Sequence, residues 1–108
     1  MTSSADILVT AGHCFSSDQC DTYDWVFNYK IAKAGDNKVT VSENDVYHCK
    51  EIIAFNDPNM RGNQKDFAVI RLNRPVKGVT PLKVASKTPA VGTSIVLIGH
   101  PSGLPQKL

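Results

Sequence analysis

A histidine and an aspartate in this chain stand where acid–base chemistry could use them. Residues 7–14 read Ile-Leu-Val-Thr-Ala-Gly-His-Cys, an apolar strand that breaks at a glycine and presents His13 at a fixed point. Asp66 opens a second apolar stretch that ends at Leu72, where partial burial would make its carboxylate a strong hydrogen-bond acceptor. In a nucleophilic triad the histidine takes a hydroxyl proton and the carboxylate fixes the histidine tautomer. The pair therefore predicts two thirds of such a triad.

No serine in the chain reads as the missing nucleophile. Residues 99–103, Gly-His-Pro-Ser-Gly, resemble a nucleophile elbow, but an elbow needs Gly-x-Ser-x-Gly on a strand-to-helix turn. Here two residues separate Gly99 from Ser102, one glycine follows directly, and the neighbouring prolines favour an extended loop. The other two histidines, His48 and His100, are expected to be structural or surface residues.

Two sequence blocks resemble those of the trypsin-like (chymotrypsin-fold) serine endopeptidases. Leu8 to Cys14 is similar to the family's Thr-Ala-Ala-His-Cys block, with Gly12 in place of the second alanine, a variant associated with bacterial members. Asp66 to Leu72 is similar to the family's Asp-Ile-Ala-Leu-Leu-x-Leu block, and Arg-Pro-Val at 74–76 continues it. The blocks follow the family's order, with His13 and Asp66 separated by 53 positions (66 − 13). The resemblance implies that His13 is the general base and Asp66 its orienting carboxylate.

The resemblance also implies an all-β chain that holds one half of a double-barrel fold. Family members have two antiparallel six-stranded barrels, with the histidine and aspartate on the first and the serine on the second. This sequence lacks the Gly-Asp-Ser-Gly-Gly block and begins just after the Gly-Gly that normally precedes the histidine strand, so we expect a piece that is incomplete at both ends. Residues 1–76 would form about four strands of the first barrel, 77–91 the inter-barrel linker, and 92–108 the first strand and loop of the second barrel.

Hydrophobic alternation supports β structure along the chain. Residues 23–31 alternate apolar and polar, a turn follows at 34–37, and Val39 and Val41 open a return strand. Residues 45–55 predict a further strand and 56–65 a loop. Prolines break 73–90 into an extended connection. Residues 93–99 predict a strand with apolar groups on both faces, as in a strand whose natural neighbours lie elsewhere.

Three cysteines, Cys14, Cys20 and Cys49, leave the disulfide pairing open. Cys14 with Cys20 and Cys20 with Cys49 are both compatible with the sequence. In the matched family the cysteine after the histidine usually bonds one upstream of where this chain begins, which would leave Cys14 unpaired. Disulfide use would place the parent protein outside the cytoplasm, secreted or periplasmic. No Cys-x-x-Cys or His-x-His spacing supports a metal site, so no metal or other cofactor is expected.

Composition and charge exclude several classes of partner. The 108 residues suit a single small domain, and 42% hydrophobic with 20% charged residues is ordinary for a globular chain. The net charge of +2 comes from scattered basic residues, which predicts no nucleic acid or membrane-surface partner. No apolar run approaches the ~20 residues of a membrane span. No signal peptide is visible in the first residues of this chain.

The function implied by the resemblance is peptide-bond hydrolysis through an acyl-enzyme, with a polypeptide substrate, in a longer parent enzyme. This chain alone is expected to be inactive, because it lacks the nucleophile. The alternative is a non-catalytic, protease-like binding or assembly module, against which the intact His13 and Asp66 argue. Open strand edges left by the absent segments would favour self-association of this chain.

Overall fold

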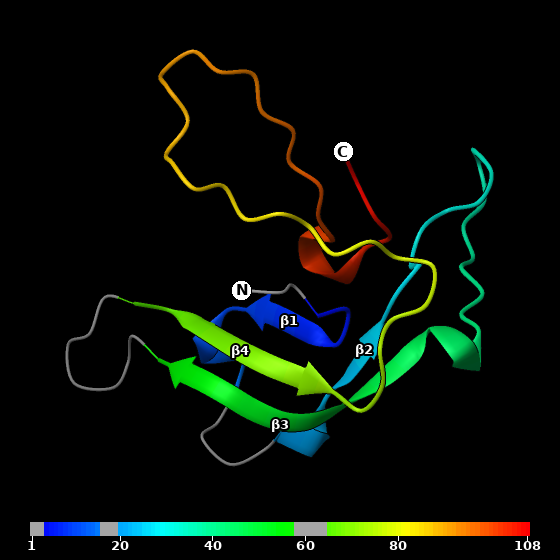
Figure 1. Ribbon diagram of the computed structural model, residues 1–108. Helices are drawn as coiled ribbons and strands as arrows, with labels where there is room; N and C mark the ends of the chain where they lie inside the picture. Colours follow the sequence, from blue (N-terminus) through cyan, green and yellow to red (C-terminus); the bar gives the residue numbers. More distant parts are fainter. Residues whose placement is uncertain (1–3, 16–19, 58–64) are drawn as a thin grey trace.

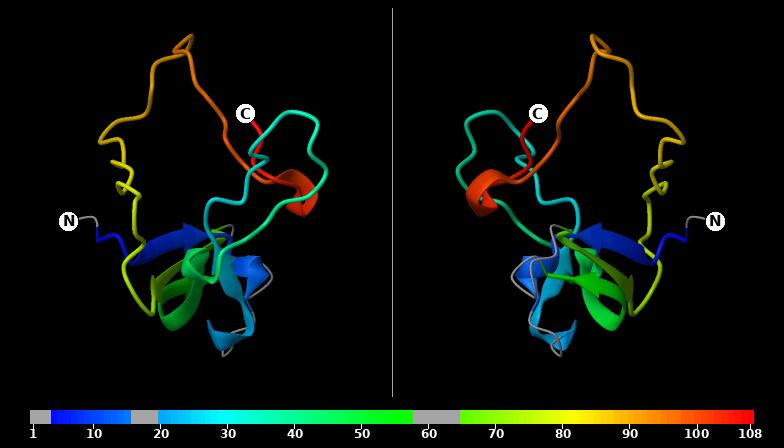
Figure 2. Two further views of the ribbon diagram at one scale, coloured as in Figure 1. Left: turned by 90° about the vertical axis from the view of Figure 1, so that its right-hand side faces the viewer. Right: turned by 90° about the vertical axis from the view of Figure 1, so that its left-hand side faces the viewer.

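The computed structural model describes residues 4–15, 20–57 and 65–108, and in these residues the chain is all-β (Figure 1). The strands are β1 (Ile7–Thr10), β2 (Asp24–Val26), β3 (Val46–Asn56) and β4 (Phe67–Leu72). They form one antiparallel sheet in the order β1-β4-β3-β2. Four strands in one twisted sheet are consistent with the half-barrel that the sequence predicts, although the sheet does not show the six strands of a complete barrel (Figure 2).

The remaining regular structure in these residues consists of short 3-10 turns. They are η1 (Gly12–Cys14), η2 (Cys20–Thr22), η3 (Glu43–Asp45) and η4 (Pro101–Gly103). Ser42 caps η3, where its hydroxyl accepts a hydrogen bond from the Asn44 N–H at 3.2 Å. No helix of the described residues is long and apolar enough to cross a membrane.

A small hydrophobic core forms where β4 lies between β1 and β3. Every second side chain of β4 is buried, because neighbouring residues of a strand point to opposite faces of the sheet. The buried hydrophobic residues of the described chain are Phe15, Tyr47, Ala68, Ile70, Leu72 and Val76. This core fixes which face of β4 is turned inward.

Arg74 closes one end of the core. Its guanidinium lies 3.7 Å from the centroid of the Tyr47 ring, a cation–π contact. The same group donates hydrogen bonds to the carbonyl oxygens of Asn44 and Val46, at 3.0 and 2.8 Å. The Tyr47 hydroxyl accepts a hydrogen bond from the Lys77 N–H at 3.1 Å. The segment after β4 is thereby held against the start of β3.

The expected strand over residues 23–31 is shorter than predicted, and its return strand from Val39 is absent. β2 ends at Val26, and residues 27–42 form neither strand nor helix. The physical reason is Asn28, whose φ of 57° lies in the left-handed region that a strand cannot accommodate. Its side-chain amide donates to Asp45 Oδ1 at 2.8 Å, which stabilises the turn. The chain then leaves the sheet as a long excursion before returning at η3 (Figure 1).

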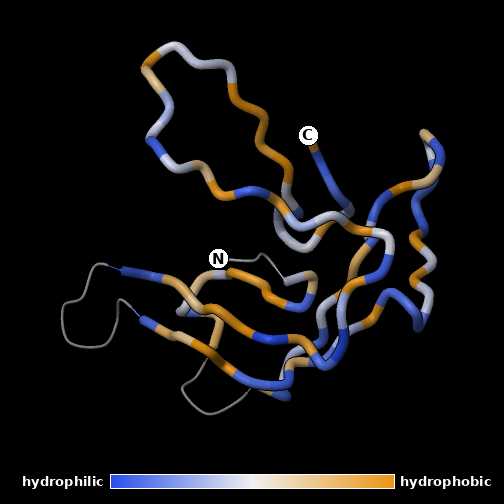
Figure 3. Tube along the Cα trace, in the orientation of Figure 1, coloured by the Kyte–Doolittle hydropathy of each residue, from blue (hydrophilic) through white to orange (hydrophobic). Residues whose placement is uncertain are grey.

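The predicted strand over residues 93–99 is also absent. Residues 77–98 contain no strand or helix, and only Gly99 makes a single bridge, to Lys107. A strand needs a neighbour for its backbone groups, and no strand of the described residues lies beside this segment. The segment is hydrophobic and stands away from the sheet (Figure 3), with Ile95 80% and Leu97 85% exposed. The expectation that this segment packs poorly on the sheet is confirmed, whereas the extended form of the connection over 73–90 and the proposed boundaries at 76 and 91 stay predictions.

The core predicts that alanine substitution destabilises the fold far more at one isoleucine of the sheet than at another. Ile70→Ala should lower the free energy of unfolding by about 2–5 kcal/mol, because Ile70 is fully buried and the substitution leaves a cavity. Ile53→Ala is the matched control, because Ile53 on β3 is 47% exposed. This substitution should change the free energy of unfolding by no more than about 0.5 kcal/mol. Urea unfolding of both variants measures the difference. Equal losses would contradict the assigned core.

Candidate active site

The register of β1 on β4 brings His13 and Asp66 to the same rim of the sheet. Thr10, the last residue of β1, lies opposite Ala68 near the start of β4. His13 follows Thr10 by three residues within η1, and Asp66 precedes Ala68 by two. Antiparallel pairing places the end of one strand beside the start of the next. The two side chains are therefore neighbours although 53 positions separate them in the sequence.

Asp66 holds His13 through both of its carboxylate oxygens. The backbone N–H of His13 donates to Oδ1 at 2.9 Å. The ring nitrogen Nδ1 of His13 lies 2.6 Å from Oδ2. Two contacts from one residue fix both the position and the rotation of the imidazole. The expected hydrogen bond between imidazole and carboxylate is confirmed.

Hydrogen bonding lowers the pKa of Asp66 below its ordinary value. The largest cause is the hydrogen bond from the His13 backbone N–H, followed by the bond from the His13 ring. Partial burial acts in the opposite direction, and the charge of His13 and the backbone of Gly12 contribute smaller lowering effects. Asp66 is consequently ionised at neutral pH and accepts hydrogen bonds only. The proton of the short contact therefore belongs to Nδ1 of His13.

This tautomer leaves the lone pair of the neutral imidazole on Nε2. Nε2 has no partner among the described residues, and the His13 side chain is 56% exposed. A neutral imidazole with a free Nε2 can take a proton from a hydroxyl group placed beside it. The arrangement can therefore act as a general base that is oriented by a carboxylate.

The other sequence candidates lie in different surroundings. The rings of His100 and Tyr29 have centroids 5.8 Å apart, and His100 Nδ1 lies 3.1 Å from the Leu104 carbonyl oxygen. Ser102 adopts a left-handed conformation in η4, with φ of 52°, and makes no hydrogen bond to His13 in the described part of the chain. Neither residue joins the His13–Asp66 pair.

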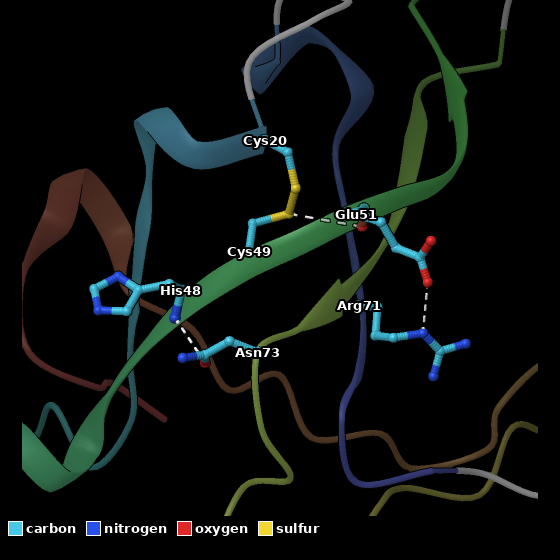
Figure 4. The surroundings of a disulfide bond; sticks show 6 residues. All are labelled: Cys20, His48, Cys49, Glu51, Arg71 and Asn73. Atoms are coloured by element: carbon cyan, nitrogen blue, oxygen red, sulfur yellow. Dashed lines mark hydrogen bonds and ion pairs between the residues drawn. A yellow bond between two sulfur atoms is a disulfide. The ribbon is translucent and has the colours of Figure 1, made fainter.

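A second histidine–carboxylate pair escaped the sequence analysis. Nδ1 of His48 lies 2.6 Å from Oδ1 of Asp24, and both side chains are more than half exposed. Asn73 fixes the His48 backbone, since its side-chain oxygen accepts the His48 N–H at 3.1 Å and its own N–H donates to the His48 carbonyl oxygen at 2.8 Å (Figure 4). No local sequence signal marks this pair, because it depends on the register of β2 on β3, which sets Asp24 opposite His48.

The disulfide joins Cys20 to Cys49, one of the two pairings that the sequence left open. It ties η2 to β3 beside His48 (Figure 4). Cys14 is unpaired and exposed, which agrees with the expectation from the family pattern.

These features define a class of protein: an all-β chain whose antiparallel sheet carries a paired histidine and aspartate at one rim. The family model described as a trypsin-like peptidase domain matches residues 2–108, and the chain belongs to this family. Comparisons with curated proteins and with solved structures gave no match. The family resemblance that the two sequence blocks indicated is confirmed.

The lowered pKa of Asp66 predicts a specific dependence of stability on pH. A carboxylate whose pKa is depressed by folding stabilises the fold above its unfolded value, here 3.8, and this contribution is lost as the pH falls through the lower folded value. Asp66→Asn should therefore unfold at lower urea concentration than the parent chain at pH 7. The difference in urea midpoint between Asp66→Asn and the parent chain should become smaller below pH 3.8.

The matched control for this prediction is Asp36→Asn. The Asp36 carboxylate makes no hydrogen bond among those found in the described residues, so removing its charge should not reproduce the narrowing gap. Urea titrations at several pH values measure all three proteins. A gap between Asp66→Asn and the parent that stays constant down to pH 2 would contradict the assigned role of the carboxylate.

Proposed function

We propose that this chain supplies the general base and the orienting carboxylate of a serine endopeptidase. His13 takes the proton of a serine hydroxyl as the serine attacks the peptide carbonyl, and then returns it to the leaving amine. Asp66 holds the Nδ1–H tautomer and stabilises the imidazolium that forms. The serine and the oxyanion hole come from polypeptide outside these 108 residues. The observation that carries the proposal is the paired contact of Asp66 with the ring and the backbone N–H of His13.

The exposure of the pair supports a partner segment that covers it. The side chains of His13 and Asp66 are 56% and 32% exposed. Electrostatic stabilisation in active sites depends on the exclusion of water. A second barrel placed against this rim would supply both the serine and that shielding.

The substrate class is a polypeptide, and the proposed location is outside the cytoplasm, either secreted or periplasmic. The location rests on the Cys20–Cys49 disulfide, because such bonds persist mainly in oxidising compartments. The bacterial assignment rests on Gly12 in the histidine block alone. Nucleic acid and membrane are not proposed as partners.

The first functional prediction concerns the polypeptide that contains this chain together with a Gly-x-Ser-Gly-Gly segment. It should hydrolyse peptides and be labelled by a fluorophosphonate probe. Asp66→Asn should lower kcat by about 10⁴-fold, because the productive tautomer is lost. His13→Ala should lower kcat by about 10⁶-fold, because the base itself is lost. The matched control is His48→Ala, which removes the other histidine with the same 2.6 Å carboxylate contact and should leave kcat unchanged.

The 108-residue chain alone should show neither hydrolysis nor labelling. Labelling that disappears in Ser102→Ala would mean that the chain carries its own nucleophile and would overturn the assignment. A folded, longer polypeptide with the serine block but no activity would favour the alternative of a non-catalytic binding or assembly module.

A second prediction is that the 108-residue chain self-associates through the hydrophobic segment 95–98. These four residues are 58–85% exposed, carry no charge and have no strand beside them in the described structure, so backbone edges and apolar side chains are both available to another copy. Ile95→Lys with Leu97→Lys should shift the chain toward monomer in size exclusion with light scattering. Val84→Lys, at a position in the preceding connection that is 94% exposed, is the control and should not shift the chain toward monomer. A monomeric parent chain would contradict this prediction.

A further inference from the structure

Gly12 is a point of very close approach between the histidine segment and the two central strands. It is the buried residue of η1. A β-carbon at this position would lie 2.8 Å from the carbonyl carbon of Asn56, 2.9 Å from the carbonyl oxygen of Phe67, and closer still to the carbonyl oxygen of Asn56. Non-bonded separations below 3.0 Å are essentially never found for real β-carbons. The space beside Gly12 therefore excludes even a methyl group.

The atoms that fill this space cannot move aside like the tip of a flexible side chain. All three are backbone atoms, and Asn56 and Phe67 are register partners in the β3–β4 ladder. The φ of Gly12 lies outside the left-handed region that favours glycine. Glycine is required at this position by the close approach alone.

The clash would fall between the two halves of the His13–Asp66 pair. Gly12 precedes His13, and Phe67 follows Asp66. The tightest contacts are with Asn56, which pairs with Phe67 in the β3–β4 ladder. Movement that relieves all three contacts therefore displaces either the peptide that carries the His13 N–H or the Asn56–Phe67 pair, in which Phe67 is bonded directly to Asp66. The affected contacts are the 2.9 Å bond to the backbone N–H and the 2.6 Å bond to the ring.

We infer that Gly12 is a positioning residue, whose missing side chain lets His13 and Asp66 approach to hydrogen-bond distance. The family block that this segment resembles has alanine here, so the family's own residue would not fit the space between Asn56 and Phe67 in this chain. A catalytic role for Gly12 rests on the proposed function of His13 and Asp66. Its effect on the contact between these two residues is measured without an activity assay.

The test compares Gly12→Ala with Gly99→Ala in the 108-residue chain. Gly99 is the matched control, because its φ also lies outside the left-handed region and no described atom lies within 4 Å of the position that an added β-carbon would take. The readout is the ring ¹⁵N chemical shifts of His13, assigned by their loss in His13→Ala and recorded on the neutral imidazole. The parent chain and Gly99→Ala should show protonated Nδ1. In Gly12→Ala, the form of His13 with protonated Nδ1 should no longer be the dominant tautomer. An unchanged His13 tautomer in folded Gly12→Ala would overturn the inference.

A measurement on the parent chain covers the case in which Gly12→Ala does not fold. The α-protons of Gly12 should give strong nuclear Overhauser contacts to backbone protons of Asn56 and Phe67. Their presence would support the close approach, and their absence would refute it.

Asp66→Asn separates this inference from the proposed function. If Asp66→Asn leaves the His13 tautomer unchanged, the carboxylate does not orient the imidazole, and the proposed function fails. If Asp66→Asn removes the Nδ1–H tautomer while Gly12→Ala keeps it, the proposed function stands and only the role of Gly12 is wrong.

Discussion

The antiparallel register between β1 and β4 is the constraint on which the candidate site depends. Thr10 opposite Ala68 places the residues after β1 beside those before β4. A slip by one residue would turn Ala68, Ile70 and Leu72 from the core to the other face, because side chains alternate along a strand. The burial of these three small and branched side chains thus fixes the register, and the register fixes the separation of His13 from Asp66.

Charged residues at the other end of the same strands support this register. Arg71 of β4 donates to Asp6, just before β1, at 3.0 Å and to Glu51 of β3 at 2.7 Å. Ser4 donates a further hydrogen bond to Asp6. Exposed ion pairs add little stability individually. These ion pairs hold the strands in register, because Arg71 of β4 contacts both β3 and the residue just before β1.

The parts of the structure that the sequence predicts correctly depend on local patterns. The strand predicted over 45–55 is β3, which runs over 46–56, and His13 and Asp66 stand at the ends of apolar strands that pair in the structure. The parts it missed depend on a conformation or register with no local signal. The left-handed turn at Asn28 ends β2 early, and the pairing of Asp24 with His48 follows only from the β2–β3 alignment.

The Cys20–Cys49 disulfide lets the loop between β2 and η3 change in sequence and length without releasing β2 from β3. The bond spans 29 positions of sequence, and the whole of β2 and residues 27–45 lie inside this covalent ring. A protease that cut the excursion would leave both fragments attached, with β2 still tethered beside β3. Lengthening the excursion is also inexpensive, since each doubling of a flexible loop adds only about 0.6 kcal/mol of closure entropy. The ring therefore marks the stretch of this chain where insertions and new sequence can accumulate while the half-barrel keeps its shape.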